Sequence, residues 1–142
     1  MRTYEEYEKK CKKQEERNNE FLKIFEEDLR KTGLSNKTIS RHVENAEFYI
    51  NEYLFYEEPW PMEKGCSELD MFFGDFFIRK CIWSTPATIK STAASLKKFY
   101  KCMYEHGYLK KELYDTLCYD IKESMEDWQD ECARFNDGDF DF

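Results

Sequence analysis

The sequence has few residues that interrupt a helix, with 5 glycines and 3 prolines among 142 residues. It also lacks any run of about 20 apolar residues, the length that a membrane-spanning helix needs. The opening residues, MRTYEEYEKK, contain no apolar run of the kind that a signal peptide carries. Hydrophobic residues make up 41% of the chain, which excludes collagen-like, linker and disordered compositions. We therefore expect a folded, soluble, cytoplasmic protein that does not bind membranes.

Residues that carry out chemistry are also scarce. The two histidines, His42 and His106, lie in helical patterns, and neither has a serine, cysteine or aspartate partner in a recognisable catalytic arrangement. The sequence has no glycine-rich phosphate loop. Neighbouring carboxylates abound, but such pairs are surface runs in most charged helices. We therefore predict no catalytic residue and no cofactor, and we expect a protein that is not an enzyme.

The six cysteines are widely spaced and form no C-x-x-C pair, which argues against a zinc ribbon or a thioredoxin-type site. Cys102 and His106 are four residues apart on a predicted helix, so they can share a metal ion. Two ligands without a second pair make a weak site. Disulfides would suit the even number of cysteines, but they are typical of secreted chains. We therefore predict reduced, buried thiols and no metal site.

Apolar residues recur at the helical spacing of three and four in five segments. Ser35 is a candidate N-cap, and Ser84-Thr85-Pro86 places a hydroxyl cap before a proline at the first helical position. Residues 67–70, Ser-Glu-Leu-Asp, resemble a capping box and predict a third helix N-terminus. The five segments cover about residues 4–31, 35–54, 67–81, 85–106 and 110–135. This pattern predicts an all-α domain of four or five helices.

The apolar stripes of these segments also predict the hydrophobic core. Phe76 is expected to be fully buried, so that truncating it to alanine costs about 3–5 kcal/mol. The predicted core consists of Phe25, Leu29, Ile39, Val43, Ile50, Phe72, Phe76, Ile89, Leu96, Tyr100 and Met103.

The net charge of −8 is unevenly distributed along the chain. Residues 1–113 carry equal numbers of basic and acidic side chains, whereas residues 114–142 carry 2 basic and 10 acidic side chains. Residues 86–111 contain six lysines and one acid, Glu105. An acidic protein is usually a poor ligand for phosphate backbones. That objection applies here to the C-terminal segment only.

The lysines of the fourth segment lie on one side of its predicted helix. Lys90, Lys97 and Lys101 form a narrow stripe about a quarter turn from the apolar face, and Lys98 lies at its edge. Such a stripe can lie against the phosphates of double-stranded DNA. It can equally be an ordinary solvated face.

Two further surfaces have alternative interpretations. Aromatic residues surround the turn at Pro59 and Pro61, which we call the proline turn, and they would mark a contact surface if they are exposed. These residues are Tyr53, Phe55, Tyr56 and Trp60. The apolar stripe of the fifth segment, from Tyr114 to Phe135, either completes the core or packs against a protein partner, as a coiled coil does. The spacing of its apolar residues is shared by both cases, and we favour the core.

Two strings resemble the paired-helix halves of the N-terminal SAM-like, or core-binding, domain of phage integrases and other tyrosine recombinases. They are TGLSNKTISRHVENAEFYINEYL and STPATIKSTAASLKKFYKCMYEHGYLKKELYDTL. The first string matches the family pattern at Gly33, Leu34, Ser35 and Thr38. The second matches at Thr88, Ile89, Leu96, Phe99, Tyr100, Gly107 and Leu109. The resemblance covers about residues 21–117 and implies a SAM-like orthogonal bundle of four to five helices.

The chain also departs from this family. The usual catalytic domain, with an Arg, a Lys, a His-x-x-Arg and a tyrosine nucleophile, does not follow, and the chain runs instead into an acidic fifth segment. Recombinase activity is therefore not implied. The resemblance implies DNA-facing use of the second and fourth helices, which carry Lys37, Arg41, Lys90, Lys97, Lys98 and Lys101.

These observations predict four parts of the chain. A charged helical arm covers residues 1–20, the SAM-like core covers 21–113, an acidic amphipathic helix covers 114–135, and a disordered acidic tail covers 136–142. We expect a non-catalytic, integrase-like module that binds double-stranded DNA, a function in the area of DNA recombination. The alternative is a protein-interaction module that uses the same fold. Removing residues 114–142 should tighten DNA binding, provided that the fifth segment is not part of the core.

Overall fold

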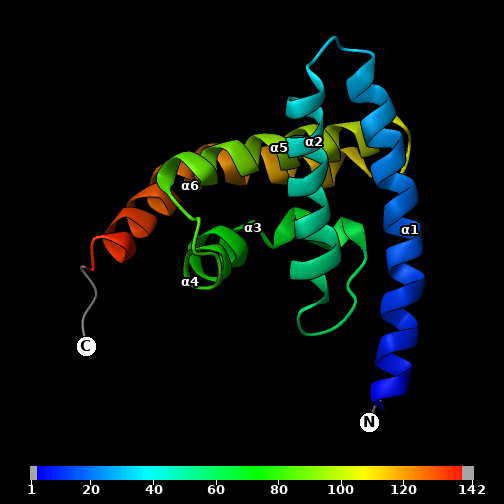
Figure 1. Ribbon diagram of the computed structural model, residues 1–142, viewed down its shortest axis with the longest axis horizontal. Helices are drawn as coiled ribbons and strands as arrows, with labels where there is room; N and C mark the ends of the chain where they lie inside the picture. The colour runs from blue at the N-terminus through cyan, green and yellow to red at the C-terminus, as the bar shows by residue number, and fades with distance from the viewer. Residues whose placement is uncertain (1–2, 139–142) are drawn as a thin grey trace.

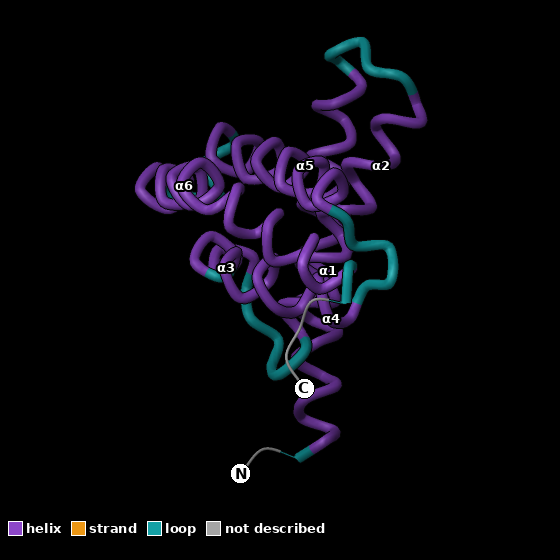
Figure 2. Tube along the Cα trace, turned by 90° about the vertical axis from the view of Figure 1, so that its left-hand side faces the viewer, coloured by secondary structure: helices purple, strands orange, loops and turns teal. Residues whose placement is uncertain are grey.

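The computed structural model describes residues 3–138, and this part of the chain is helical without any strand (Figure 2). The predicted all-α class is therefore confirmed. The described residues contain six α-helices, because the third predicted segment (residues 67–81), which we call the phenylalanine-rich segment, is divided into two short helices by a π-helical turn. The α-helices are α1 (Tyr4–Arg30), α2 (Asn36–Glu47), α3 (Leu69–Met71), α4 (Phe77–Lys80), α5 (Pro86–Glu105) and α6 (Lys111–Asn136). The π-helical turns are η1 (Phe48–Glu52) and η4 (Phe72–Phe76), and the 3₁₀ turns are η2 (Tyr53–Phe55) and η3 (Met62–Ser67).

Local capping explains why α2 and α5 begin where the sequence predicts. The Ser35 hydroxyl accepts a hydrogen bond from the Thr38 backbone N–H at 3.2 Å. Thr85 and Thr88 form a reciprocal capping box at the start of α5, with Pro86 at its first position. Gly107 has φ +86°, a left-handed conformation that favours glycine and ends α5.

The long helices form two crossed pairs (Figure 1). Helix α2 packs beside α1, while α5 packs against α2 and α6, and the α5–α6 pair runs across the α1–α2 pair. The first turns of α1 extend beyond the other helices in both views (Figures 1 and 2). The predicted tail begins at Asn136, the last residue of α6, and residues 139–142 lie outside the described part of the chain.

Nine of the eleven predicted core residues are buried, and the exceptions are Val43 and Phe76, which are partly buried. The expectation of a fully buried Phe76 is therefore wrong. The reason is the π-helical turn η4, in which the Phe77 N–H donates to the Phe72 carbonyl five residues earlier. This turn places Phe77, rather than Phe76, after Phe72 on the buried face.

Helix α6 completes the core. Leu117, Trp128 and Cys132 are buried, and Trp128 packs on Phe73 with ring centroids 5.0 Å apart. The indole N–H of Trp128 donates to Asp70 Oδ1 at 2.9 Å, which holds α6 against the start of the phenylalanine-rich segment. The apolar stripe of α6 is therefore occupied by this chain's own core.

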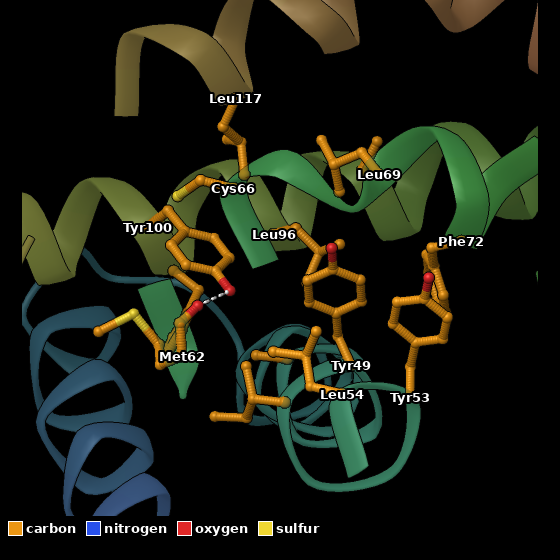
Figure 3. Packing of buried hydrophobic residues seen from close by; sticks show 14 of the residues in the cluster. Tyr49, Tyr53, Leu54, Met62, Cys66, Leu69, Phe72, Leu96, Tyr100 and Leu117 are labelled. Carbon is orange, nitrogen blue, oxygen red and sulfur yellow. Dashed lines mark hydrogen bonds between the residues drawn. The ribbon is translucent and has the colours of Figure 1, made fainter. Parts of the chain in front are cut away.

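The centre of the core is packed tightly around Gly65 in η3. The hydroxyl of Tyr49 donates to the Gly65 carbonyl at 2.7 Å. The hydroxyl of Tyr100 donates to the Met62 carbonyl, also at 2.7 Å (Figure 3). A Cβ atom on Gly65 would lie 2.1 Å from the Tyr100 hydroxyl oxygen and 2.6 Å from Tyr49 Cε2. The two buried tyrosine rings would have to move to admit it.

We expect Gly65→Ala to destabilise the domain by about 1–3 kcal/mol, because overpacking displaces these rings. Gly74→Ala is the matched control, since a Cβ on Gly74 would meet its nearest neighbour, Trp128, at 3.8 Å. That control should unfold at the wild-type denaturant concentration or higher, because Gly74 lies in a helical segment. Equal stability of the two variants in chemical denaturation would contradict this packing.

Candidate functional site

A buried polar contact joins α2 to α5. His42 Nδ1 and the Asn45 side-chain amide lie 2.7 Å and 3.0 Å from the Ser95 hydroxyl oxygen. The Ser95 hydroxyl donates its single proton to the Ser91 carbonyl at 3.2 Å, so it accepts from both other groups. In this arrangement His42 carries a proton on Nδ1 and donates it to Ser95. This network fixes the α2 surface relative to α5.

Two of the predicted DNA-binding residues lie close to this contact. Burial lowers the pKa of His42 below its ordinary value, and the charges of Arg41 on α2 and Lys98 on α5 lower it further. The structure thus places Arg41 and Lys98 near the same buried histidine, one on each helix. Because the folded pKa of His42 lies below the unfolded one, His42 makes the fold less stable as the pH falls through its ordinary pKa of about 6.5.

All six predicted DNA-binding residues are exposed. None of them takes part in an ion pair with another of residues 3–138. These residues are Lys37 and Arg41 on α2, and Lys90, Lys97, Lys98 and Lys101 on α5. Their charges are therefore available to a ligand.

The four lysines of α5 lie on two sides of its exposed face. Lys98 lies one turn after Ser95, on the side of α5 that faces α2. Lys97 and Lys101 precede Tyr104 on the other side of the exposed face, where Tyr104 stacks on Tyr114 of α6 at 5.8 Å. Lys90 lies seven residues before Lys97 and shares that side. The exposed face of α5 therefore carries four lysines between the α2 border and the α6 border, with one acid, Glu105, at its C-terminal end.

The acidic residues of α6 mostly point away from this surface. Gln129 marks the side of α6 that faces α5, because its side chain donates to the Pro86 carbonyl at 2.9 Å. Lys122 lies seven residues before Gln129, and Lys111 eleven residues before Lys122, so both lysines share that side. Helical spacing places Asp120, Glu123, Asp127 and Glu131 on the far side of α6 from Gln129, and Glu112 and Asp130 about a quarter turn from it. Asp115 and Glu126 lie on the same side as Gln129, where Asp115 pairs with Lys111. Most of the acidic side chains of α6 therefore lie away from its border with α5.

A second candidate surface is a cleft of about 260 Å³ beside the proline turn. Of the four aromatic residues predicted there, Tyr53 and Phe55 are buried, Trp60 is partly buried and Tyr56 is 61% exposed. Tyr56 and Trp60 line the cleft with Met71, which is 59% exposed. The predicted aromatic contact surface is therefore smaller than the sequence pattern implies.

A third group of side chains joins the ends of α1 and α5. His106 Nε2 lies 2.8 Å from Asp28 Oδ2, and the Cys102 thiol donates to the same oxygen at 3.2 Å. Burial of Asp28 opposes its ionisation, but the hydrogen bonds from His106 and Cys102 outweigh it and lower the carboxyl pKa. Burial and the Asp28 carboxylate raise the pKa of the Cys102 thiol.

This group does not have the geometry of a nucleophile and its base. In a catalytic triad the histidine lies between the nucleophile and the carboxylate, whereas here Asp28 lies between Cys102 and His106. The thiol also has a raised pKa, which disfavours the reactive thiolate. The arrangement therefore does not support thiol catalysis.

Comparisons with known proteins add no family or fold relative. A scan against models of protein families, a search of curated proteins and a search of solved structures each found no match. Within residues 3–138, no helix combines the length and the apolar character that crossing a bilayer requires.

Proposed function

We propose that the protein is a non-catalytic module that binds double-stranded DNA through the exposed basic faces of α2 and α5. The observation that carries the proposal is the set of six exposed basic residues on two helices that pack directly on each other. The resemblance to the core-binding domain of tyrosine recombinases implies the same two helices. The crossed arrangement of the α1–α2 and α5–α6 pairs supports an assignment to a SAM-like orthogonal bundle.

The physical basis of binding is counterion release. Each lysine or arginine that neutralises a phosphate frees a counterion from the duplex, and this contribution does not depend on the base sequence. The α2–α5 contact through Ser95 holds Arg41 and Lys98 on neighbouring helices, so that two positions along a backbone can be contacted together. The acidic side chains on the far side of α6 from Gln129 repel phosphate, and this repulsion favours the approach of the duplex to the lysines of α5.

A salt titration of binding to a generic duplex of 20–30 base pairs tests the proposal. If the six residues contact phosphates, the plot of log affinity against log salt should have a slope of about −5. Absence of salt-dependent binding would contradict the proposal and favour a protein-interaction module.

His42 gives an independent prediction, because Arg41 and Lys98 act on its pKa. Phosphates placed beside these two cations should offset their charge, and the pKa of His42 should rise when duplex DNA binds. The histidine ring signals in NMR spectra report this pKa directly, since the chain has only two histidines. Lys98→Gln should raise the pKa of His42 in the free protein for the same reason.

One result would contradict this prediction. If duplex DNA binds but the pKa of His42 stays at its value in the free protein, then phosphates do not approach Arg41 and Lys98. The contact surface would then lie elsewhere on the domain.

A second candidate function is supported by the cleft beside the proline turn. Tyr56 and Met71 expose apolar surface at its edge, and Lys80 lies 5.6 Å from the centre of the Tyr56 ring. This surface suits a short segment of a protein partner. The predicted partner contact through residues 114–135 has less support, because the apolar side of α6 is already buried in the core.

A further inference from the structure

Asp28, Cys102 and His106 bring three different metal-binding atoms together. One carboxylate oxygen, the thiol sulfur and one ring nitrogen all lie within 4.8 Å of one another. Cys102 and His106 are four residues apart on one side of α5, and Asp28 comes from the last turn of α1. Asp28 is 74 residues away from Cys102, so the sequence pattern gives only two of the three atoms.

The distances are close to those of a tetrahedral zinc site. Ligand atoms at Zn–S and Zn–N/O distances of 2.0–2.3 Å are about 3.3–3.6 Å apart around a tetrahedron. The two contacts of Asp28 Oδ2, at 2.8 Å and 3.2 Å, are shorter than these edges by about 0.5 Å or less. The sulfur and the ring nitrogen lie within 4.8 Å of each other, so they have to approach by at most about 1.3 Å. Rotation of His106, whose side chain is 39% exposed at the end of α5, can provide this movement.

The surroundings also favour a cation. The site lies at the C-terminal ends of both α1 and α5, where the helix dipoles place partial negative charge. Asp28 already carries the negative charge that a cation needs, and the Cys102 thiol loses its proton to solvent when a sulfur–metal bond forms. The buried sulfur and the exposed imidazole leave the fourth position facing water.

We propose that Asp28, Cys102 and His106 bind a zinc-type transition-metal ion with one position open to solvent. A mixed set of oxygen, nitrogen and sulfur ligands selects a borderline-soft ion over magnesium or calcium. The ion would join the ends of α1 and α5 and so strengthen the contact between the two helix pairs. This site is separate from the basic surface of α2 and α5, and it does not depend on DNA binding.

Cobalt and zinc titrations of the reduced full chain test this site. Co²⁺ should give a sulfur-to-cobalt charge-transfer band and the intense visible bands of a tetrahedral site, and one equivalent of Zn²⁺ should remove both. Zn²⁺ should also raise the thermal midpoint, because it binds the folded state. Asp28→Asn and His106→Gln change side chains that are not fully buried, so both variants should fold. Each should weaken Zn²⁺ binding by at least about tenfold, which is what the loss of even an outer-shell partner costs.

Two cysteine variants separate this site from general thiol binding. Cys102→Ser should abolish the charge-transfer band, whereas Cys118→Ser, which changes a half-buried thiol outside the group, should retain it. The proposal is overturned if the wild type shows neither band nor zinc binding. It is also overturned if Asp28→Asn, Cys102→Ser and His106→Gln all bind Zn²⁺ as the wild type does, since the metal would then bind adventitiously.

Discussion

Replacing Trp128 with alanine is expected to destabilise the domain by about 3–5 kcal/mol. Trp128 is 2% exposed, and it is among the largest fully buried side chains within residues 3–138. Its removal would leave a cavity against Phe73 and would take away the hydrogen bond from the indole N–H to Asp70. This contact is a main attachment of α6 to the phenylalanine-rich segment.

Chemical denaturation followed by far-UV circular dichroism measures this loss. Tyr119→Ala is the matched control on the same helix, because Tyr119 is 64% exposed and its loss should change stability by no more than about 0.5 kcal/mol. If Trp128→Ala were as stable as Tyr119→Ala, α6 would not be docked as described.

Because one face of α6 is buried, the effect of its acidic residues on DNA binding cannot be tested by removing the helix. The sequence suggests removing residues 114–142, on the condition that they are not part of the core. Leu117, Trp128 and Cys132 are buried, so that truncation would expose the core and unfold the domain. Neutralising acids on the outer side of α6, such as Glu123 and Asp127, keeps the fold and reduces the same repulsion.

Helix positions were predictable where a local signal sets them. Ser35 and Thr85 cap their helices through contacts with residues three positions later, and such contacts are visible in a sequence window. Ser67 has the same local pattern, but the prediction that it caps the next helix was wrong, because Glu68 is the N-cap of α3. The Ser67 hydroxyl donates to the Lys64 carbonyl and closes η3, while the next helix begins at Leu69.

The burial of Phe76 was not predictable from periodicity, because the helical period itself changes. A spacing argument assumes 3.6 residues per turn, and the π-helical turn at Phe72–Phe76 adds a residue. The aromatic rings of Tyr49 and Tyr53 pack on Phe72 from another segment and help to determine which ring is buried. A short stretch of sequence does not show such contacts with residues from a distant segment.

The candidate surfaces were predictable where they lie on a single helix, but not where they depend on contacts between helices. Spacing places Lys90, Lys97 and Lys101 on one side of α5, and the structure shows that side exposed. The approach of Lys98 to His42, and of Asp28 to Cys102, depends on contacts between helices that are distant in sequence. No residue pattern in a single segment indicates either approach.

Replacing Lys90, Lys97 and Lys101 together with glutamine is expected to flatten the salt dependence of DNA binding by up to about three units of slope. Each lysine that contacts a phosphate contributes nearly one counterion to the release on binding. The three side chains are exposed on a helix face, so the variant should keep the wild-type fold and thermal midpoint. Affinity should fall most at low salt, where counterion release favours binding most strongly.

The most direct test of DNA binding through α5 compares this triple variant with a control of equal charge. Lys9, Lys12 and Lys13 are exposed on the first turns of α1, which extend away from α5 in Figure 1, and replacing them with glutamine changes the net charge by the same amount. The measurement is the slope of log affinity against log salt for one duplex. We predict that the α5 variant loses up to about three units of slope and that the α1 variant keeps most of the wild-type value. Equal slopes for the two variants, or no salt-dependent binding by the wild type, would contradict the account.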